Sequence, residues 1–171
     1  MSLLAGIAAT WASPRAAMAA RVGQGQREDR AIAALMGAAI TFLIARTPAL
    51  ARAAELDPSV PFQARLGGSM LALLFLMPLL SYALAWVLHL VAGRGAREGA
   101  RGQGWRARAT LFWMLLAIGP AVLAQGLIEG LAGPGALSAT TGLLVFLIFV
   151  WFLWAGLRGA YGTAANGMRQ G

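Results

Sequence analysis

The chain has no cysteine and no lysine among its 171 residues, and it has only one histidine and six acidic residues. Without cysteine it has no disulfide framework, no thiolate metal site and no cysteine nucleophile. The single histidine, His89, has no second ligand-type residue at metal-binding spacing beside it. No nucleophile–base pair stands out either. We therefore expect no catalytic residue, no metal site, no cofactor and no enzymatic activity.

Charge is also scarce, and this scarcity indicates a membrane protein. Charged residues make up 12% of the chain, against roughly 25% in soluble domains. Three long apolar runs are present: Leu66–Val91, Ala109–Leu131 and Ala136–Tyr161. Each exceeds the roughly 20 residues that a helix needs to cross about 30 Å of hydrocarbon. The sequence therefore predicts an all-α membrane protein. The absence of Lys beside abundant Ala, Gly and Arg is typical of GC-rich, bacterial coding sequences.

A fourth apolar segment is short, and arginine counting favours treating it as a span. Only 15 residues separate Arg30 from Arg46, which rise about 22 Å as a helix. The segment spans only if Arg46 snorkels or if the helix continues past Pro48. If it spans, eleven arginines share one side and three lie on the other; if not, seven lie on each side. The positive-inside rule favours four crossings with both termini cytoplasmic, in the bacterial inner membrane.

The resulting organisation has three parts. Helical spacing of apolar residues over 2–12 predicts a short amphipathic helix in the membrane interface, with Trp11 at headgroup level. We expect this interfacial helix plus a polar connector (residues 1–30), a bundle of four transmembrane helices (31–161) with an Arg/Gly-rich cytoplasmic loop (92–108), and a cytoplasmic tail (162–171).

Small residues at helical spacing mark candidate packing faces. Ala33, Gly37 and Thr41 share one face of the first span, and Gly126 with Gly130 forms a GxxxG pattern in the third. Such spacing lets helix backbones approach closely in lipid. It serves packing within the chain or, alternatively, self-association.

Two polar residues lie within the third apolar run. Gln125 and Glu129 are four residues apart and so share a helix face. In an antiparallel bundle Glu129 approaches the same membrane surface as Arg65, so we predict a structural ion pair between these two. Bends are expected at Pro78 and at Gly119-Pro120. A polar path past these bends would instead favour a small transporter or channel component.

The basic loop carries the candidate contacts with lipid or a protein partner. They are Arg94, Arg97, Arg101, Trp105, Arg106 and Arg108. Between two membrane helices, such a segment is typical of contact with anionic headgroups on the cytoplasmic leaflet. The glycines do not have GxGxxG spacing, and no strand precedes them. We therefore expect membrane lipid and other membrane proteins as partners, and no nucleic acid.

The order of several features resembles that of bacterial Yip1-family membrane proteins. The opening Thr10–Arg21 (TWASPRAAMAAR) is followed by an apolar segment, a helix ending in Gly93–Gly95 (GRG), a Gly-rich basic loop and a helix with Gly119-Pro120. The resemblance covers roughly residues 10–162. The first crossing is shorter than is usual there and the acidic motif of the eukaryotic relatives is absent, so their link to Rab-like GTPases is not transferred.

What the resemblance implies is an all-helical inner-membrane protein of no established enzymatic activity. We accordingly expect a non-enzymatic accessory or scaffold protein. The alternatives are a small transporter or channel component, and an accessory or assembly subunit of an energy-transducing complex. Convergence of Ser81, Gln125 and Glu129 on one cavity would favour the transporter.

Overall fold

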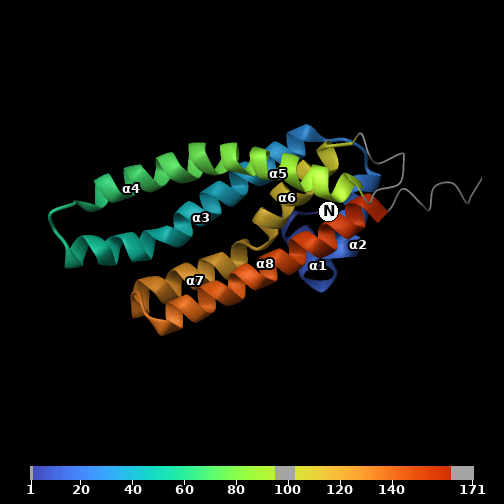
Figure 1. Ribbon diagram of the computed structural model, residues 1–171. Helices are drawn as coiled ribbons and strands as arrows, with labels where there is room; N and C mark the ends of the chain where they lie inside the picture. Colours follow the sequence, from blue (N-terminus) through green and yellow to red (C-terminus); the bar gives the residue numbers. More distant parts are fainter. Residues whose placement is uncertain (1, 95–102, 163–171) are drawn as a thin grey trace, which may run out of the picture.

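The computed structural model describes residues 2–94 and 103–162, and no strand occurs in that part of the chain (Figure 1). The predicted all-α class is confirmed. The helices are α1 (Leu3–Ala12), α2 (Pro14–Gly23), α3 (Glu28–Leu56), α4 (Phe62–Leu71), the π-helical segment η1 (Ala72–Leu76), α5 (Met77–Arg94), α6 (Trp105–Ala117), α7 (Gly119–Ala132) and α8 (Ala136–Gly162). Arg97 and Arg101 of the predicted loop, and residues 163–171 of the tail, lie outside the described residues.

The long helices give the chain the character of a multi-pass membrane protein. Three are long and apolar enough to cross a bilayer: α3, the continuous helix over Phe62–Gly93, and α8. The pair α6–α7 meets the same criteria as one span broken by a 45° bend. Figure 1 shows that successive spans run in alternate directions, with the α3–α4 and α7–α8 connections at one end. We call the opposite end, where α3 and α6 begin and α5 and α8 finish, the basic end.

The first span is long because α3 continues through Pro48. Proline has no N–H to donate to the carbonyl four residues earlier, here that of Ile44. The Thr47 hydroxyl donates to this carbonyl instead, with an Oγ1–O distance of 2.7 Å. The helix therefore reaches 29 residues. Of the two ways in which this segment could span, continuation past Pro48 is the one observed.

The two predicted bends have different outcomes. Before Pro78, the turn of η1 widens and the Met77 N–H bonds to the Ala72 carbonyl, five residues back. The helix continues through Pro78 without a break, over Phe62–Gly93. At Gly119-Pro120 the bend between α6 and α7 is confirmed at 45°, because Pro120 cannot donate to the preceding turn.

The predicted GxxxG face packs within the chain, against α3. A Cβ added at Gly126 would lie 2.0 Å from the backbone oxygen of Ala45, and one at Gly130 would lie 2.3 Å from the Pro48 Cβ. Neither distance is sterically allowed, so only glycine permits this approach. The close contact between α3 and α7 thus depends on glycine at both positions.

The face predicted on α3 is only partly right. Gly37 faces α6, where a Cβ added to the glycine would lie 3.2 Å from the Leu116 Cδ1 atom, and Thr41 packs against Gly119. Ala33, however, is exposed, and the prediction for it is wrong. The buried stripe passes through Ala34 instead. One residue turns a helix by about 100°, which places Ala33 off the contact face.

The centre of the bundle is α6. Eight of its 13 residues are buried, and they contact α3, α5, α8 and the N-terminal helices. Phe112 and Met114 of α6 and Phe152 of α8 have no exposed surface. This central position matters for function because the first turns of α6 reach the basic end.

The N-terminal helices pack into the bundle. Helix α1 forms as predicted, but Trp11 lies beside the break between α6 and α7, where its Nε1–H donates to the Ala117 carbonyl at 2.9 Å. The indole is therefore engaged by the bundle, and its position at headgroup level stays a prediction. Helix α2 packs on the last turns of α8, where a Cβ at Gly159 would lie 2.3 Å from the Arg15 oxygen. The Trp11 contact has a local cause. At the break the Ala121 N–H bonds to the Ile118 carbonyl, so the Ala117 carbonyl lacks its usual helical donor and accepts from Trp11 instead.

Candidate functional site: an arginine and tryptophan pocket

A pocket of about 50 Å³ lies at the basic end, where α2, α3 and α6 meet. Its polar lining comes from the end of α2, the connector and the start of α3, and its aromatic lining from α6. Met18, Val22, Ala31 and Ala109 supply the apolar part. We call this the arginine pocket; its chemically distinctive residues are Arg21, Gln24, Arg27, Arg30, Trp105 and Trp113.

Arg21 and Trp113 form the centre of the pocket. The Arg21 Cζ atom lies 3.1 Å from the centroid of the Trp113 ring, a cation–π contact. The ring is also held by α1, because its Nε1–H donates to the Thr10 hydroxyl at 2.9 Å. Thr10 in turn donates to the Gly6 carbonyl at 2.8 Å. The N-terminal helix therefore orients the aromatic wall on which the guanidinium rests.

Gly6 leaves room for this arginine. A Cβ at Gly6 would lie 2.7 Å from the Arg21 Nη2 atom and 3.2 Å from the Trp113 ring. The guanidinium is thus confined between the α1 backbone and the indole. The absence of a side chain at Gly6 is what allows the stack.

Positive charge exceeds negative charge around the pocket. Arg27 pairs with Asp29 at 3.4 Å, whereas Arg30 donates only to the neutral Gln24 amide oxygen, at 2.9 Å. Among the described residues, neither Arg21 nor Arg30 forms an ion pair with an acid. Burial, and then the charge of Arg30, lower the pKa of the Arg21 guanidinium from its ordinary value. Both causes are those expected of two cations that share a partly dry site without a counter-ion.

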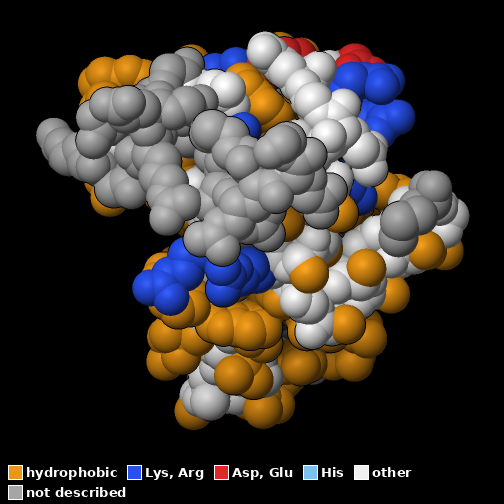
Figure 2. Space-filling model, turned by 90° about the vertical axis from the view of Figure 1, so that its right-hand side faces the viewer, with side chains coloured by type: hydrophobic (Ala, Val, Ile, Leu, Met, Phe, Trp, Pro, Cys, Tyr) orange, Lys and Arg blue, Asp and Glu red, His pale blue; other side chains and the backbone are white. Residues whose placement is uncertain are grey.

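Of the residues predicted to contact lipid, three lie at the start of α6, and two of these have partners within the chain. Trp105 lines the arginine pocket. Arg106 donates to Gln103 and to the Ala160 carbonyl, and Arg108 is paired with Glu28 of α3. These two arginines therefore join helices within the chain. Figure 2, which views the basic end, shows the basic side chains in separate patches, with hydrophobic side chains gathered below them in this view.

The arginines that line the pocket are not evident from the sequence. Residues 22–30 (VGQGQREDR) read as a polar connector only. A usable signal is present, because Trp105 and Trp113 are eight residues apart and so fall near one face of a helix. Which basic residues meet that face depends on how α2 and α3 pack, and spacing alone does not show it.

His89, near the end of α5, has a structural partner. Its Nδ1 lies 2.9 Å from the hydroxyl of Tyr161 in α8, and the backbone at Gly93 and Gly104 lies beside its ring. In the described part of the chain, no group of three or more His, Cys, Asp or Glu side chains gathers as a metal site would require. The contact joins the ends of α5 and α8.

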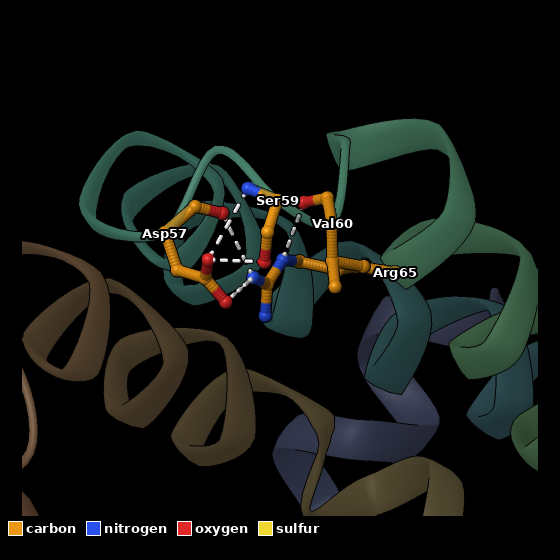
Figure 3. Close-up of polar contacts among 4 residues, drawn as sticks. All are labelled: Asp57, Ser59, Val60 and Arg65. Atoms are coloured by element: carbon orange, nitrogen blue, oxygen red, sulfur yellow. Dashed lines mark hydrogen bonds and ion pairs between the residues drawn. The ribbon is translucent and has the colours of Figure 1, made fainter.

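The predicted Arg65–Glu129 ion pair is wrong. Arg65, in the first turn of α4, donates to the Asp57 carboxylate at 2.9 Å and to the carbonyls of Asp57 and Val60 (Figure 3). The connector between α3 and α4 supplies all three acceptors, so a local contact satisfies the arginine. The arginine that reaches the end of α7 is Arg52, whose Nη1 donates to the Leu131 carbonyl at 3.0 Å.

The Asp57 contacts predict a pH-dependent connector. Hydrogen bonds from Ser59 and then from Arg65 lower the pKa of the Asp57 carboxyl. Since the folded-state pKa is below the unfolded value of about 3.9, the stabilisation is present above that value and is lost as pH falls through the folded pKa. We expect amide exchange over residues 57–65, corrected for intrinsic rates, to quicken as pH falls below about 4.

The matched variants for this prediction are Asp57→Asn and Glu55→Gln. The first is expected to quicken exchange at neutral pH and to remove most of the acid dependence. The second removes the same charge from an exposed side chain that forms no ion pair in the described part of the chain, and it is expected to behave as the parent. Equal behaviour of the two variants would contradict the assignment.

The three polar residues that would have favoured a transporter do not converge. Ser81 lines an apolar groove of about 320 Å³ between α3, α5, α6 and α8, whose lining includes neither Gln125 nor Glu129. Gln125 instead donates to the Ser138 carbonyl of α8 at 2.9 Å. Ser81 and Gln125 therefore lie at different places in the bundle.

Comparison of the chain with protein-family models, curated proteins and solved structures finds no match. Function is accordingly argued from the geometry of the arginine pocket and the apolar helices.

Proposed function

We propose that the chain is a non-enzymatic accessory or scaffold protein of the bacterial inner membrane, of Yip1-like type, with its basic end and both termini on the cytoplasmic side. The basic end would contact anionic lipid, and the apolar helix faces would contact other membrane proteins. The carrying observation is the arginine pocket. It brings two arginines without an ion pair among the described residues beside two tryptophans, and such contacts suit headgroups better than catalysis.

The apolar exterior supports a role next to other membrane proteins. Large side chains on α5 and α8 remain exposed, among them Leu79, Trp86, Phe146 and Trp154. Lipid covers such surfaces in a membrane, and packing against other helices does so equally well. The scattering of Ser81 and Gln125 supports this role over the transporter alternative.

Topology can be tested directly because the chain lacks cysteine. We expect Ser59→Cys, in the α3–α4 connector, to react with a membrane-impermeant thiol reagent in intact spheroplasts. Ser2→Cys, before α1, is expected to react only after permeabilisation. The reverse pattern would place the basic end outside and contradict the proposal.

The accessory role is tested by looking for a membrane protein that binds the chain. After extraction in mild detergent, we expect the chain to migrate with a defined membrane protein at fixed stoichiometry. A cross-link formed in intact membranes from α5 or α8 should identify the same protein. A monodisperse particle without that protein, together with no such cross-link, would contradict the accessory role.

A further inference from the structure

The arginine pocket has the features of a built anion site. Two guanidinium groups, those of Arg21 and Arg30, converge on it without an acid paired to either among the described residues, and the Gln24 amide lies beside them. Two indole rings close the sides. An anion here would offset the repulsion between the two arginines and supply hydrogen-bond acceptors in place of the water that burial removes from Arg21. Guanidinium groups bind phosphate oxygens through paired, charge-assisted hydrogen bonds.

The size of the pocket limits what enters it. Its volume is about 50 Å³, whereas one water molecule needs about 10–15 Å³ on the same measure. The pocket therefore has room for more than one water molecule, and the oxygens of one phosphate group suit that space. The apolar residues Met18 and Val22 beside the arginines suit the glycerol and ester part of a lipid. Trp105 and Trp113 suit the same depth, since indoles favour the headgroup region.

We propose that the arginine pocket binds the phosphate of one anionic phospholipid, held by Arg21 and Arg30 between α2, α3 and α6. This goes beyond the general attraction of a basic surface for anionic lipid, because it requires one site with one lipid. It deepens the proposed function and rests on it only for the side of the membrane that the pocket faces. A zwitterionic headgroup fits less well, since its ammonium group adds a third cation beside two unpaired arginines.

The experiment is native mass spectrometry of the full chain in a lipid-free detergent, titrated with phosphatidylglycerol. We expect one phosphatidylglycerol per chain to bind in preference to phosphatidylethanolamine. Arg21→Gln and Arg30→Gln are each expected to weaken it roughly tenfold, the loss of a charge-assisted bond. Inorganic phosphate at millimolar concentration should compete poorly if the site takes a lipid; full displacement by it would indicate a free-phosphate site and overturn the lipid assignment.

Arg158→Gln is the matched control. Arg158 lies at the same end, with its Cζ 3.9 Å from the Trp154 ring, but it does not line the pocket. We expect it to leave binding unchanged. If all three variants weaken binding equally, the attraction is that of a charged surface and the site is refuted.

Gly6→Ala separates position from charge. Its Cβ would displace the Arg21 guanidinium from the Trp113 ring while the net charge stays the same. We expect several-fold weaker phosphatidylglycerol binding with unchanged helical circular dichroism. Unchanged binding in this variant, or a parent chain that retains no lipid at all, would overturn the proposal. Unchanged binding in Gly6→Ala would refute the single site and leave general lipid contact standing, and neither outcome bears on whether the chain has a protein partner.

Discussion

Replacing Gly126 by alanine is expected to lower the free energy of unfolding by about 2 kcal/mol, within the range usual for overpacking. The new Cβ would lie 2.0 Å from the backbone oxygen of Ala45. A backbone atom cannot rotate away as the end of a side chain does, so α7 must move off α3. The gain of up to about 1 kcal/mol in helix propensity offsets only part of this cost.

The control for Gly126→Ala is Gly68→Ala. Gly68 lies in α4 with open space around it, so alanine there gains helix propensity without a clash. We expect the control to equal or exceed the stability of the parent in detergent, measured by the loss of helical circular dichroism during thermal or dodecyl sulfate titration. A Gly126→Ala chain as stable as this control would show that the α3–α7 contact does not contribute.

Removal of the Trp11 side chain is the second large effect. The indole packs edge-on against Phe152, with ring centroids 5.1 Å apart, and donates to the Ala117 carbonyl at the break. Truncation of a buried aromatic costs roughly 3–5 kcal/mol. Because Trp11 is 39% exposed, we expect Trp11→Ala to lower the free energy of unfolding by less, about 2 kcal/mol.

Trp11→Phe isolates the hydrogen bond. It keeps an aromatic ring against Phe152 and removes only the donor, so we expect a loss of about 1 kcal/mol. Trp86→Ala serves as the control, because Trp86 is 64% exposed and should change stability little. All variants are compared in the same detergent titration. If Trp11→Ala and Trp86→Ala lose equal stability, α1 is not held by the α6–α7 break.

Apolar length is enough to predict most of the fold. The second, third and fourth spans follow from apolar runs that are long enough to cross the hydrocarbon of a bilayer. The first does not follow from length, since the run ends at Arg46, and Pro48 normally ends a helix. The Thr47 hydroxyl changes this outcome by donating to the carbonyl that Pro48 leaves without a donor. Arginine counting predicts four spans by an independent route, and the structure has four candidates when the bent pair α6–α7 is counted as one span.

The candidate site is less predictable because it depends on which helices meet. The sequence predicts that basic and aromatic residues of the 92–108 loop form the contact surface. Trp105 does line the arginine pocket, but the guanidinium groups of the pocket come from α2, the connector and α3. The Arg65 partner is hard to predict for a different reason. Asp57-Pro58-Ser59 is a turn sequence whose carboxylate folds back locally, and a local acceptor prevails over a distant one.

The Trp11–Ala117 bond also constrains the order in which the protein is built. Its two residues are separated by 106 positions, and ribosomes add roughly 5–20 residues per second. Helix α1 therefore emerges on the order of ten seconds before its partner exists. It cannot form this bond while α3, α4–α5 and the first part of α6 are being synthesised. The first helix synthesised therefore takes its final position only after α6, the first part of the third span, has appeared.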